Sequence, residues 1–540
     1  MQFVRNGPDI PERLLQAHED GHVVLFCGAG ISYPAGLPGF SGLVEQIYES
    51  LSIEPNQVQQ AALDAKQFDT AINLLEANMV EGRTSVRQEL AKILLHPDLT
   101  NPDATATHEA LLTLARNREG KTRLVTTNFD RLFEHVTASK SPSIPSFQAP
   151  LLHVPKQRWD GLVYLHGLLS EKPTPGELDQ LVVSSGDFGL AYLIEGWAAH
   201  FVSRLFRNYT VCFVGYSIND PIPRYMMDAL AADHILGESS PEMFAFGDFS
   251  EERETECANE WKAKNVTPIL YCKDEAHTCL HETLRAWADT YRDGVRGKER
   301  IVDRYAADHP SKSTKQDNFV GRMLWALSDP SGLPAKRFAD MDPVPPLDWL
   351  LGPLSEERYK HADLSRFGVP AQTPTDKDKY LKFSLIRRPS PYTRAPWMVI
   401  TGARNRGSEW NEWDETMFHL ARWLTRHLDD PKLVWWLVER GCQLHPNLVE
   451  LIDRRLNELA RLESIGSASD KEELKRICEN APNAIPRPVM RTLWRLLLTG
   501  RVYPGSSALN LYHWHDQFRH EGLTVSTRIA LREILTPYVS

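Results

Sequence analysis

Residues 23–32 are Val23-Val24-Leu25-Phe26-Cys27-Gly28-Ala29-Gly30-Ile31-Ser32, an apolar run that ends in two glycines flanking an alanine. Five consecutive apolar residues between His22 and Gly28 predict a strand that is buried on both faces, as in a parallel sheet. Glycine has no Cβ, so we expect Gly28 and Gly30 to take positive φ and to leave room for a diphosphate beside the amides that follow. The amphipathic stretch 43–51 then places a helix start near the same point.

The glycine pattern departs from two common nucleotide-binding fingerprints. A G-x-G-x-x-G motif needs a third glycine where this chain has Tyr33, and no Gly-Lys-Ser/Thr follows the glycine turn at residues 28–30, as a P-loop would require. Taken alone, Gly-Ala-Gly after a strand is as typical of a plain strand-to-helix turn as of a ligand site. The rest of the chain has to decide between these interpretations.

Composition limits the class of protein. The chain has 540 residues, of which 24% are charged and 42% hydrophobic, and its net charge is −10. These values predict a soluble globular protein of two or three domains, with nucleic acid an unlikely principal partner. The sequence contains neither a signal peptide nor an apolar run long enough to span a membrane. Seven scattered cysteines favour a reduced, cytoplasmic setting.

Predicted strands and helices alternate over the first half of the chain. Short apolar runs predict strands at residues 23–27, 123–127, 162–165, 211–214, 243–246 and 267–271. Apolar residues spaced three or four apart predict helices at 11–19, 42–51, 59–78, 84–94, 107–116 and 190–206. This order predicts an α/β fold, a doubly wound (Rossmann-like) parallel sheet with a helical insertion over about residues 42–118.

Four of the predicted strands end in polar or glycine-containing clusters, at residues 28–32, 128–130, 166–167 and 215–220. Ligands of open parallel sheets bind beyond the carboxyl ends of the strands, so we expect the four clusters to meet at one crevice. Asn128, Asp130, Asn219 and Asp220 also suit the structural role of capping a helix. His166 has little capping value, and its place in a set of four clusters favours a functional site over a structural histidine.

At this point the residues resemble a known family. The segments 28–32, 36–40, 126–130, 165–167 and 215–217 resemble, in order, the motifs of the sirtuin (SIR2) family over about residues 10–290. The resemblance implies NAD as the substrate, with residues 28–32 at its diphosphate and ribose and 215–217 at the adenosine side. The NAD-binding residues that it implies are Gly28, Ala29, Gly30, Ser32, Phe40, Asn128, Asp130, Gly215, Tyr216, Ser217, Asn219 and Asp220. Among them Asn128 and Asp130 would line the nicotinamide-ribose pocket, and His166 would be the catalytic histidine.

Departures from the sirtuin pattern bear on the reaction. Sirtuin deacylases usually hold zinc through two Cys-x-x-Cys pairs, but no cysteine lies between Gly167 and Val211, so no zinc is expected. Thr127 replaces the usual glutamine, and residues 39–41 replace an Asp-Phe-Arg. These changes count against deacylation. The Gly-Tyr-Ser-x-x-Asp-Pro of residues 215–221 instead resembles bacterial SIR2-like domains of antiphage defence, which implies an NAD+ hydrolase that acts by NAD depletion.

The chemistry expected of the site follows from that reaction. Cleavage of the nicotinamide–ribose bond passes through an oxocarbenium-like state, so the site must hold the sugar and stabilise positive charge. We expect Asn128 to position water or the ribose, His166 to act as general base and Asp130 to bind the carboxamide or stabilise charge. An NAD-dependent deacylase and a catalytically silent sensor of NAD or ADP-ribose remain as alternatives. Hydrolysis and cyclisation of NAD are not separated by the sequence.

The second half of the chain has a different character. Residues 296–346 are rich in charge and proline and predict a linker-rich segment, whereas 347–540 predict an α-helical domain. The predicted helices are 415–428, 433–440, 448–462, 471–479, 489–498 and 526–535. By the resemblance this domain would be a sensor or assembly module that responds to a phage protein, in a homo-oligomer. Relatives of this type are often longer, so whether the chain is part of a longer protein stays open.

Overall fold

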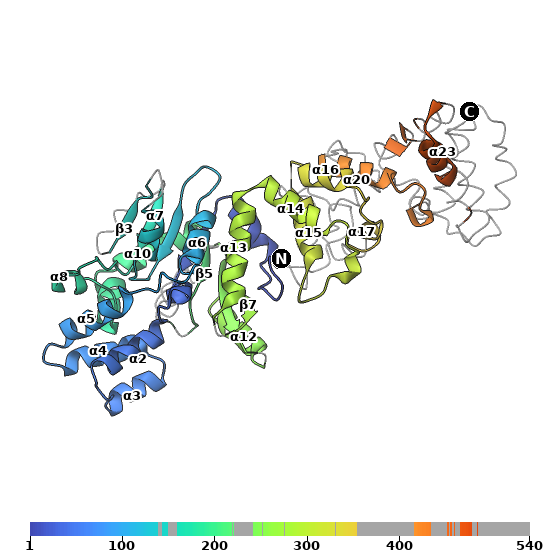
Figure 1. The fold of residues 1–540 in the computed structure, drawn as a ribbon. Helices are drawn as coiled ribbons and strands as arrows, with labels where there is room; N and C mark the ends of the chain where they lie inside the picture. The colour runs from blue at the N-terminus through green and yellow to red at the C-terminus, as the bar shows by residue number, and fades with distance from the viewer. Residues whose placement is uncertain are drawn as a thin grey trace, which may run out of the picture. The chain divides into compact units, whose positions relative to one another are not determined.

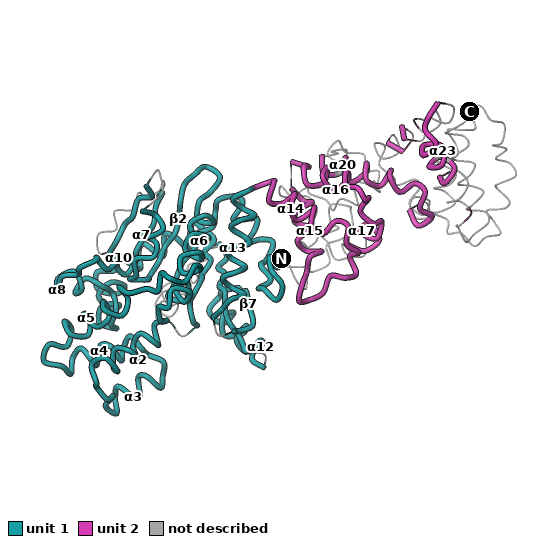
Figure 2. Tube along the Cα trace, viewed as in Figure 1, with its two compact units in different colours: residues 1–293 teal, residues 294–540 magenta. Residues whose placement is uncertain are grey.

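The structure is a computed structural model. It describes residues 1–138, 143–149, 159–218, 220, 241–250, 252–274, 276–329, 331–353, 415–433 and 465–477, with isolated positions at 451–452, 454–455, 458 and 483. The chain divides into two compact units, residues 1–293 and 294–540 (Figure 2). Each unit is described by itself.

The first unit is built on a seven-stranded sheet in which all neighbouring strands are parallel, in the order β3-β4-β2-β1-β5-β6-β7 (Figure 1). The strands are β1 Val23–Cys27, β2 Arg123–Thr126, β3 Ser146–Gln148, β4 Gly161–Tyr164, β5 Thr210–Val214, β6 Met243–Phe249 and β7 Thr267–Cys272. The predicted Rossmann-like parallel α/β fold is confirmed. Because β2 and β5 lie on either side of β1, the chain changes direction across the sheet at β1, where such folds bind ligands.

Burial on both faces explains the apolar composition of the central strands. All five residues of β1 are buried, and Phe26 pairs in register with Val125 on β2 and Phe213 on β5. The rings of Phe26 and Phe213 lie 5.4 Å apart, and Phe206 from a flanking helix packs edge-on against Phe213. The resulting core holds the carboxyl ends of the central strands in fixed register.

Helices flank the sheet and form a separate lobe. They are α1 Glu12–Glu19, a 3₁₀ segment Ala29–Ala35, α2 Phe40–Ser50, α3 Gln57–Asp64, α4 Phe68–Asn78, α5 Gly82–Leu94, α6 Ala106–Ala115, α7 Leu132–Thr137, α8 Pro175–Leu178, α9 Ser185–Phe188, a π-helical segment Gly189–Ile194, α10 Trp197–Asn208, α12 Glu254–Ala263 and α13 Thr278–Arg292. Figure 1 shows α2–α5 grouped within the predicted insertion, and their buried apolar residues share one core cluster.

Two predicted helices are each divided in two, and one strand was missed. The predicted helix 59–78 is two helices, because the chain reverses at Lys66 in the left-handed region (φ 55°) and both helices then face one core. The predicted helix 190–206 is a π-helical segment and α10, separated by Gly196 at φ 66°. Strand β3 was not predicted, since a three-residue edge strand with one apolar residue carries no periodic signal.

The second unit is helical in the part that the structure describes. Its helices are α14 Val295–Tyr305, a 3₁₀ turn Pro310–Lys312, α15 Phe319–Leu327, α16 Leu333–Asp340, α17 Asp348–Leu351, α20 Glu415–Thr425 and α23 Ala468–Lys475. The last two correspond to the predicted helices 415–428 and 471–479. Those predicted at 489–498 and 526–535, and most of 433–440 and 448–462, fall on residues outside the described ranges.

Residues 296–346 correct the expectation of a linker. This segment forms α14, α15 and α16, and Lys298 Nζ makes a mostly buried ion pair with Asp329 Oδ2 at 2.8 Å. The proline-rich end is also packed, because the indole N–H of Trp423 donates to the carbonyl of Pro345 at 2.9 Å. Charge content misled here because α14 buries a charged residue, Lys298, beside Val302, and pairs it with Asp329. Among the described helices, none is long and apolar enough to cross a bilayer.

Candidate functional site

The glycine turns after β1 and β5 cross each other at very short range. The Gly28 amide donates to the carbonyl of Val214 and the Gly30 amide to that of Gly215, both at 2.9 Å. A Cβ on Gly28 or Gly30 would lie 2.8 or 2.9 Å from Gly215 atoms. The expected positive φ is absent at Gly28 (−111°) and is found at Gly215 (74°), so close backbone approach is the reason for glycine at 28 and 30. The Gly30 amide is thereby used by the protein's own backbone.

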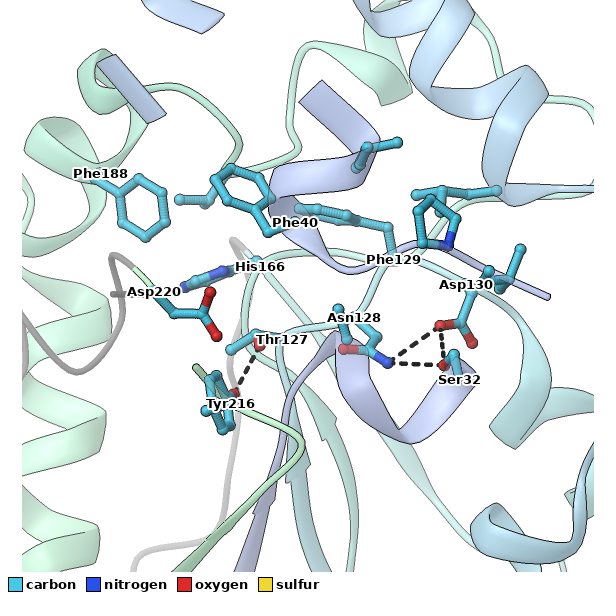
Figure 3. A pocket seen from close by; sticks show the side chains of 16 residues that line it. Ser32, Phe40, Thr127, Asn128, Phe129, Asp130, His166, Phe188, Tyr216 and Asp220 are labelled. Atoms are coloured by element: carbon cyan, nitrogen blue, oxygen red, sulfur yellow. Dashed lines mark hydrogen bonds between the residues drawn. The ribbon is translucent and has the colours of Figure 1, made fainter. Parts of the chain in front are cut away.

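A pocket opens next to this crossing, at the carboxyl ends of β1, β2, β4 and β5. The space between its lining atoms is about 620 Å³, open solvent at its mouth included. The lining residues are Ala29, Ser32, Leu37, Pro38, Phe40, Leu43, Leu94, Thr127, Asn128, Phe129, Asp130, His166, Val182, Phe188, Tyr216 and Asp220. Figure 3 shows most of the polar side chains gathered on one side of the pocket, with the rings of Phe40, Phe129 and Phe188 on the other.

Three polar side chains from two loops form one hydrogen-bonded cluster (Figure 3). The Ser32 hydroxyl donates to Asp130 Oδ2 at 2.9 Å, and Asn128 Nδ2 donates to both Ser32 Oγ and Asp130 Oδ2 at 3.1 Å. The other oxygen of Asp130 accepts the Leu132 amide at 3.0 Å at the start of α7. Because these acceptors fix the amide nitrogen of Asn128, its Oδ1 is the atom left to a ligand, and no described residue donates to it.

A histidine that the sequence analysis did not single out supports this cluster from behind. His108 on α6 is fully buried, and its Nε2 lies 3.4 Å from Ser32 Oγ. Burial lowers the pKa of His108 to about 4, so the ring is neutral at pH 7. Nothing in the apolar helix sequence around His108 distinguishes it from a core histidine, and only the packing of α6 behind the loops reveals its position.

His166 lies at the end of β4, in an aromatic environment. Its side chain is buried, and its Nε2 forms a 3.0 Å hydrogen bond with the hydroxyl of Tyr192. The ring of Phe188 packs edge-on against it, with centroids 5.1 Å apart. Burial lowers the pKa of His166 to about 3. The imidazole is therefore neutral at physiological pH and keeps a lone pair on one ring nitrogen, and the same burial makes it a weaker base than a solvated histidine.

The loop after β5 closes the polar side of the pocket. The Tyr216 hydroxyl lies 2.7 Å from Thr127 Oγ1 and donates to the carbonyl of Cys27 at 3.0 Å, which joins the ends of β5, β2 and β1. Asp220 accepts the Ser217 amide through Oδ2 at 2.7 Å. Burial raises the pKa of Asp220 to about 7. This carboxyl group thus changes charge near neutral pH.

A second cavity begins on the other side of Tyr216. It follows the carboxyl ends of β5, β6 and β7 and is lined by Lys66, Tyr216, Ser217, Ile218, Gly247, Asp248, Phe249, Ser250, Arg253, Cys257, Glu260, Trp261, Ala263, Lys264 and Lys273. Four of these side chains are basic, and Tyr216 lines both cavities. The two cavities together extend across the change of direction in the sheet.

The structure brings together most of the predicted site residues. Those that line the pocket are Ala29, Ser32, Phe40, Asn128, Asp130, His166, Tyr216 and Asp220. Gly28, Gly30 and Gly215 form the backbone crossing beside it, and Ser217 lines the second cavity. Asn219 lies outside the described residues. Within the residues that the structure describes, no group of three or more His, Cys, Asp or Glu side chains is placed to hold a metal ion.

Comparison with known proteins identifies part of the first unit. Residues 122–269, from β2 into β7, match the family model described as a SIR2-like domain. The chain is also 32% identical over 334 residues to "Uncharacterized protein y4cA" of Sinorhizobium fredii (strain NBRC 101917 / NGR234). That alignment covers 61% of this chain and 27% of the relative, so the chain spans about a quarter of the relative's length. The chain therefore contains a SIR2-like domain at residues 122–269.

Proposed function

We propose that the first unit hydrolyses NAD+ to ADP-ribose and nicotinamide. The observation that carries this proposal is the Ser32–Asn128–Asp130 cluster, which fixes the Asn128 amide in the same pocket as a neutral His166. The SIR2-like domain supports NAD as the substrate. Asn128 and His166 are the two residues to which we assign the reaction.

The two cavities suit the two halves of a dinucleotide. We place the nicotinamide ribose against Asn128 and Asp130 and the adenosine half in the second cavity, with Tyr216 between them. The second cavity is lined by four basic and two acidic side chains, and this net positive charge suits the phosphates of a dinucleotide. The aromatic side of the first pocket, which includes Phe40 and Phe188, offers an apolar surface for a flat ring.

The proposed reaction needs one proton acceptor and no proton donor. The bond between ribose C1′ and the nicotinamide nitrogen breaks with its electron pair on nitrogen, so the pyridinium leaves as a neutral ring. Positive charge moves to the ribose, near Asn128 Oδ1 and the Asp130 carboxylate, which stabilise it. Water forms the new bond to C1′, and its proton passes to the neutral ring of His166 and then to solvent.

Nicotinamide and ADP-ribose release from NAD+ tests this function. The purified full chain is compared with Asn128→Ala and His166→Ala, and with exposed-site controls Asn208→Ala and His22→Ala. We expect the parent and both controls to consume NAD+ without an acylated peptide, and the two pocket variants to be inactive. Turnover only with an acetylated peptide would support the deacylase instead, and NAD+ binding without loss would support the silent sensor. A cyclic ADP-ribose product would replace hydrolysis with cyclisation.

We also propose that this activity serves antiphage defence by NAD depletion, with the helical second unit as the sensor or assembly module of a homo-oligomer. The support is the resemblance of residues 215–221 to defence-associated domains. Bacteria that express the parent or Asn128→Ala are challenged with a phage panel while cellular NAD is measured. Protection with NAD loss by the parent alone supports the proposal. Equal phage growth and equal NAD in both strains across the panel would count against it. Light scattering of the purified chain measures the oligomeric state.

A further inference from the structure

The Tyr192 hydroxyl makes the one hydrogen bond that the His166 imidazole has among the described residues. The hydroxyl oxygen lies 3.0 Å from His166 Nε2, and both side chains are buried. We propose that Tyr192 is a positioning residue whose oxygen accepts the Nε2–H of His166, which fixes the ring orientation and tautomer and leaves Nδ1, with its lone pair, as the nitrogen that meets the substrate. This inference rests on the proposed function for its catalytic consequence, although the ring geometry itself does not depend on turnover.

The π-helical segment Gly189–Ile194 explains why Tyr192 is turned inward. Within this segment Leu193 and Ile194 are 75% and 80% exposed, whereas Tyr192 is 5% exposed. A π-helical turn rotates side chains relative to a regular α-helix, and such turns often occur at functional sites. The segment therefore turns Tyr192 inward together with Ala191 and leaves Leu193 and Ile194 at the surface.

Aromatic packing holds the tyrosine and the histidine together. The rings of Phe188 and Tyr192 stack with centroids 5.9 Å apart, and both rings meet the His166 imidazole edge-on, at 5.1 Å and 6.1 Å. Phe188 follows directly on Asp187, whose carboxylate is bound by the fully buried Arg87. The rings of Phe188 and Tyr192 thus confine the imidazole, whose one hydrogen bond among the described residues is at Nε2.

A single polar contact decides which nitrogen is free. A neutral imidazole carries one N–H and one lone pair, and a tyrosine hydroxyl can accept from the first or donate to the second, so Nδ1 is the basic nitrogen only when Nε2–H donates to Tyr192. Since Nε2 of His166 is hydrogen-bonded to Tyr192 and His166 lines the pocket, Nδ1 is the nitrogen that remains for the ribose or for water. Without the phenol the ring has no polar partner to hold it in one orientation, and both tautomers become accessible.

Tyr192→Phe tests the proposal with two readouts, and Tyr48→Phe is the matched control. Tyr48 is another buried tyrosine of the first unit, and its hydroxyl donates to the backbone carbonyl of Ala71 at 3.2 Å. Both variants lose one buried hydroxyl, so a purely structural loss of stability affects them alike. We expect kcat for NAD+ to fall roughly 100-fold in Tyr192→Phe, with KM within about twofold, while Tyr48→Phe keeps its kcat.

Nitrogen shifts of His166 give the second readout in the unliganded protein. In full chain labelled with ¹⁵N-histidine, His166 is assigned by the signals that disappear in His166→Ala. We expect one tautomer in the parent and in Tyr48→Phe, and a mixture in Tyr192→Phe. If the parent does not consume NAD+, the proposed function fails while this measurement still tests the positioning role. Unchanged His166 shifts in Tyr192→Phe, or a kcat equal to that of the parent, would overturn the inference.

Discussion

The hydroxyl of Ser32 donates to Oδ2 of Asp130 at 2.9 Å, although 98 residues separate the two in the chain. This bond joins the turn after β1 to the loop after β2. Asp130 also accepts the amide of Leu132 through Oδ1, so the same carboxylate starts α7 and holds Asn128. The structural and functional roles of Asp130 can be separated, because Oδ1 binds the Leu132 amide and Oδ2 binds Ser32 and Asn128.

Asp130→Asn should keep the fold and reduce the reaction. Asparagine caps a helix about as well as aspartate, so we expect the free energy of unfolding to change by less than about 1 kcal/mol. Asn128 loses its anionic acceptor and the pocket loses a negative charge near the ribose, so kcat should fall roughly 100-fold. NAD+ turnover and thermal unfolding of the same preparations check both parts. Full activity in Asp130→Asn would show that the charge is not used.

Gly215→Ala should be strongly destabilising, whereas Gly176→Ala should not. Gly215 has φ 74°, and a Cβ there would lie 2.7 Å from the Ile31 amide nitrogen and 3.0 Å from the Gly28 carbonyl oxygen. Backbone atoms cannot move aside as a flexible side chain does, so we expect a loss of about 1–3 kcal/mol and weaker NAD+ binding. Gly176 has open space around it and serves as the control. Urea unfolding and NAD+ titration of both variants measure the difference.

The sheet and the place of the pocket follow from the sequence for a physical reason. Parallel strands buried on both faces need continuous apolar residues, so β1 was predicted with the bounds that the structure has. Parallel strands also share a carboxyl edge, which is why chain order was enough to predict that Ser32, Asn128, His166 and Asp220 meet. Side chains at the carboxyl edge of one parallel sheet lie close together even when many residues separate them in the chain.

Residues that reach the site from helices could not be predicted in this way. His108 and Tyr192 touch Ser32 and His166 only because α6 and the π-helical segment pack against the strand ends, and neither lies at a strand end itself. Periodicity indicates which face of a helix is buried but not what that face meets. For the same reason the charge and proline content of residues 296–346 did not indicate that Lys298 forms a buried ion pair with Asp329.

Arg87→Met should destabilise the first unit far more than Arg83→Ala. Arg87 is fully buried and binds Glu76, Asp187 and the carbonyls of Leu178 and Leu181, so its removal leaves two carboxylates without their buried cation. We expect a loss of about 3–5 kcal/mol. Arg83 also contacts Asp187, but its side chain is 40% exposed, so its loss should cost less than about 1 kcal/mol. Chemical denaturation measures both values, and equal losses would contradict the role of burial.

Asp220 predicts how NAD+ consumption depends on pH. Burial raises the pKa of Asp220 to about 7, so its carboxyl group is mostly protonated at lower pH and mostly ionised at higher pH. An ionised carboxylate in the pocket favours the cationic ribose, so we expect kcat/KM to rise as pH increases through about 7. Asp220→Asn should flatten that rise. A profile with the same inflection in parent and variant would assign the titration to another group.

Buried histidines predict that the first unit loses stability in acid. Burial lowers the pKa of His18 to about 4, and His108 and His281 are shifted alike. Because the unfolded chain binds these protons at higher pH than the folded chain, the contribution is complete above about pH 6.5 and is lost as pH falls toward 4. For His18 the shift corresponds to roughly 3 kcal/mol.

His18→Gln tests this directly. The Nε2 of His18 donates to the carbonyl of Leu114 at 2.8 Å, and a glutamine amide can donate there without titrating. We therefore expect the parent to lose more stability than His18→Gln between pH 7 and about pH 4.5, and His22→Gln, at an exposed position, to behave as the parent. Denaturant unfolding at both pH values gives the comparison. Parallel losses in all three proteins would mean that the pKa of His18 is the same in the folded and unfolded chain, and that burial does not control its charge.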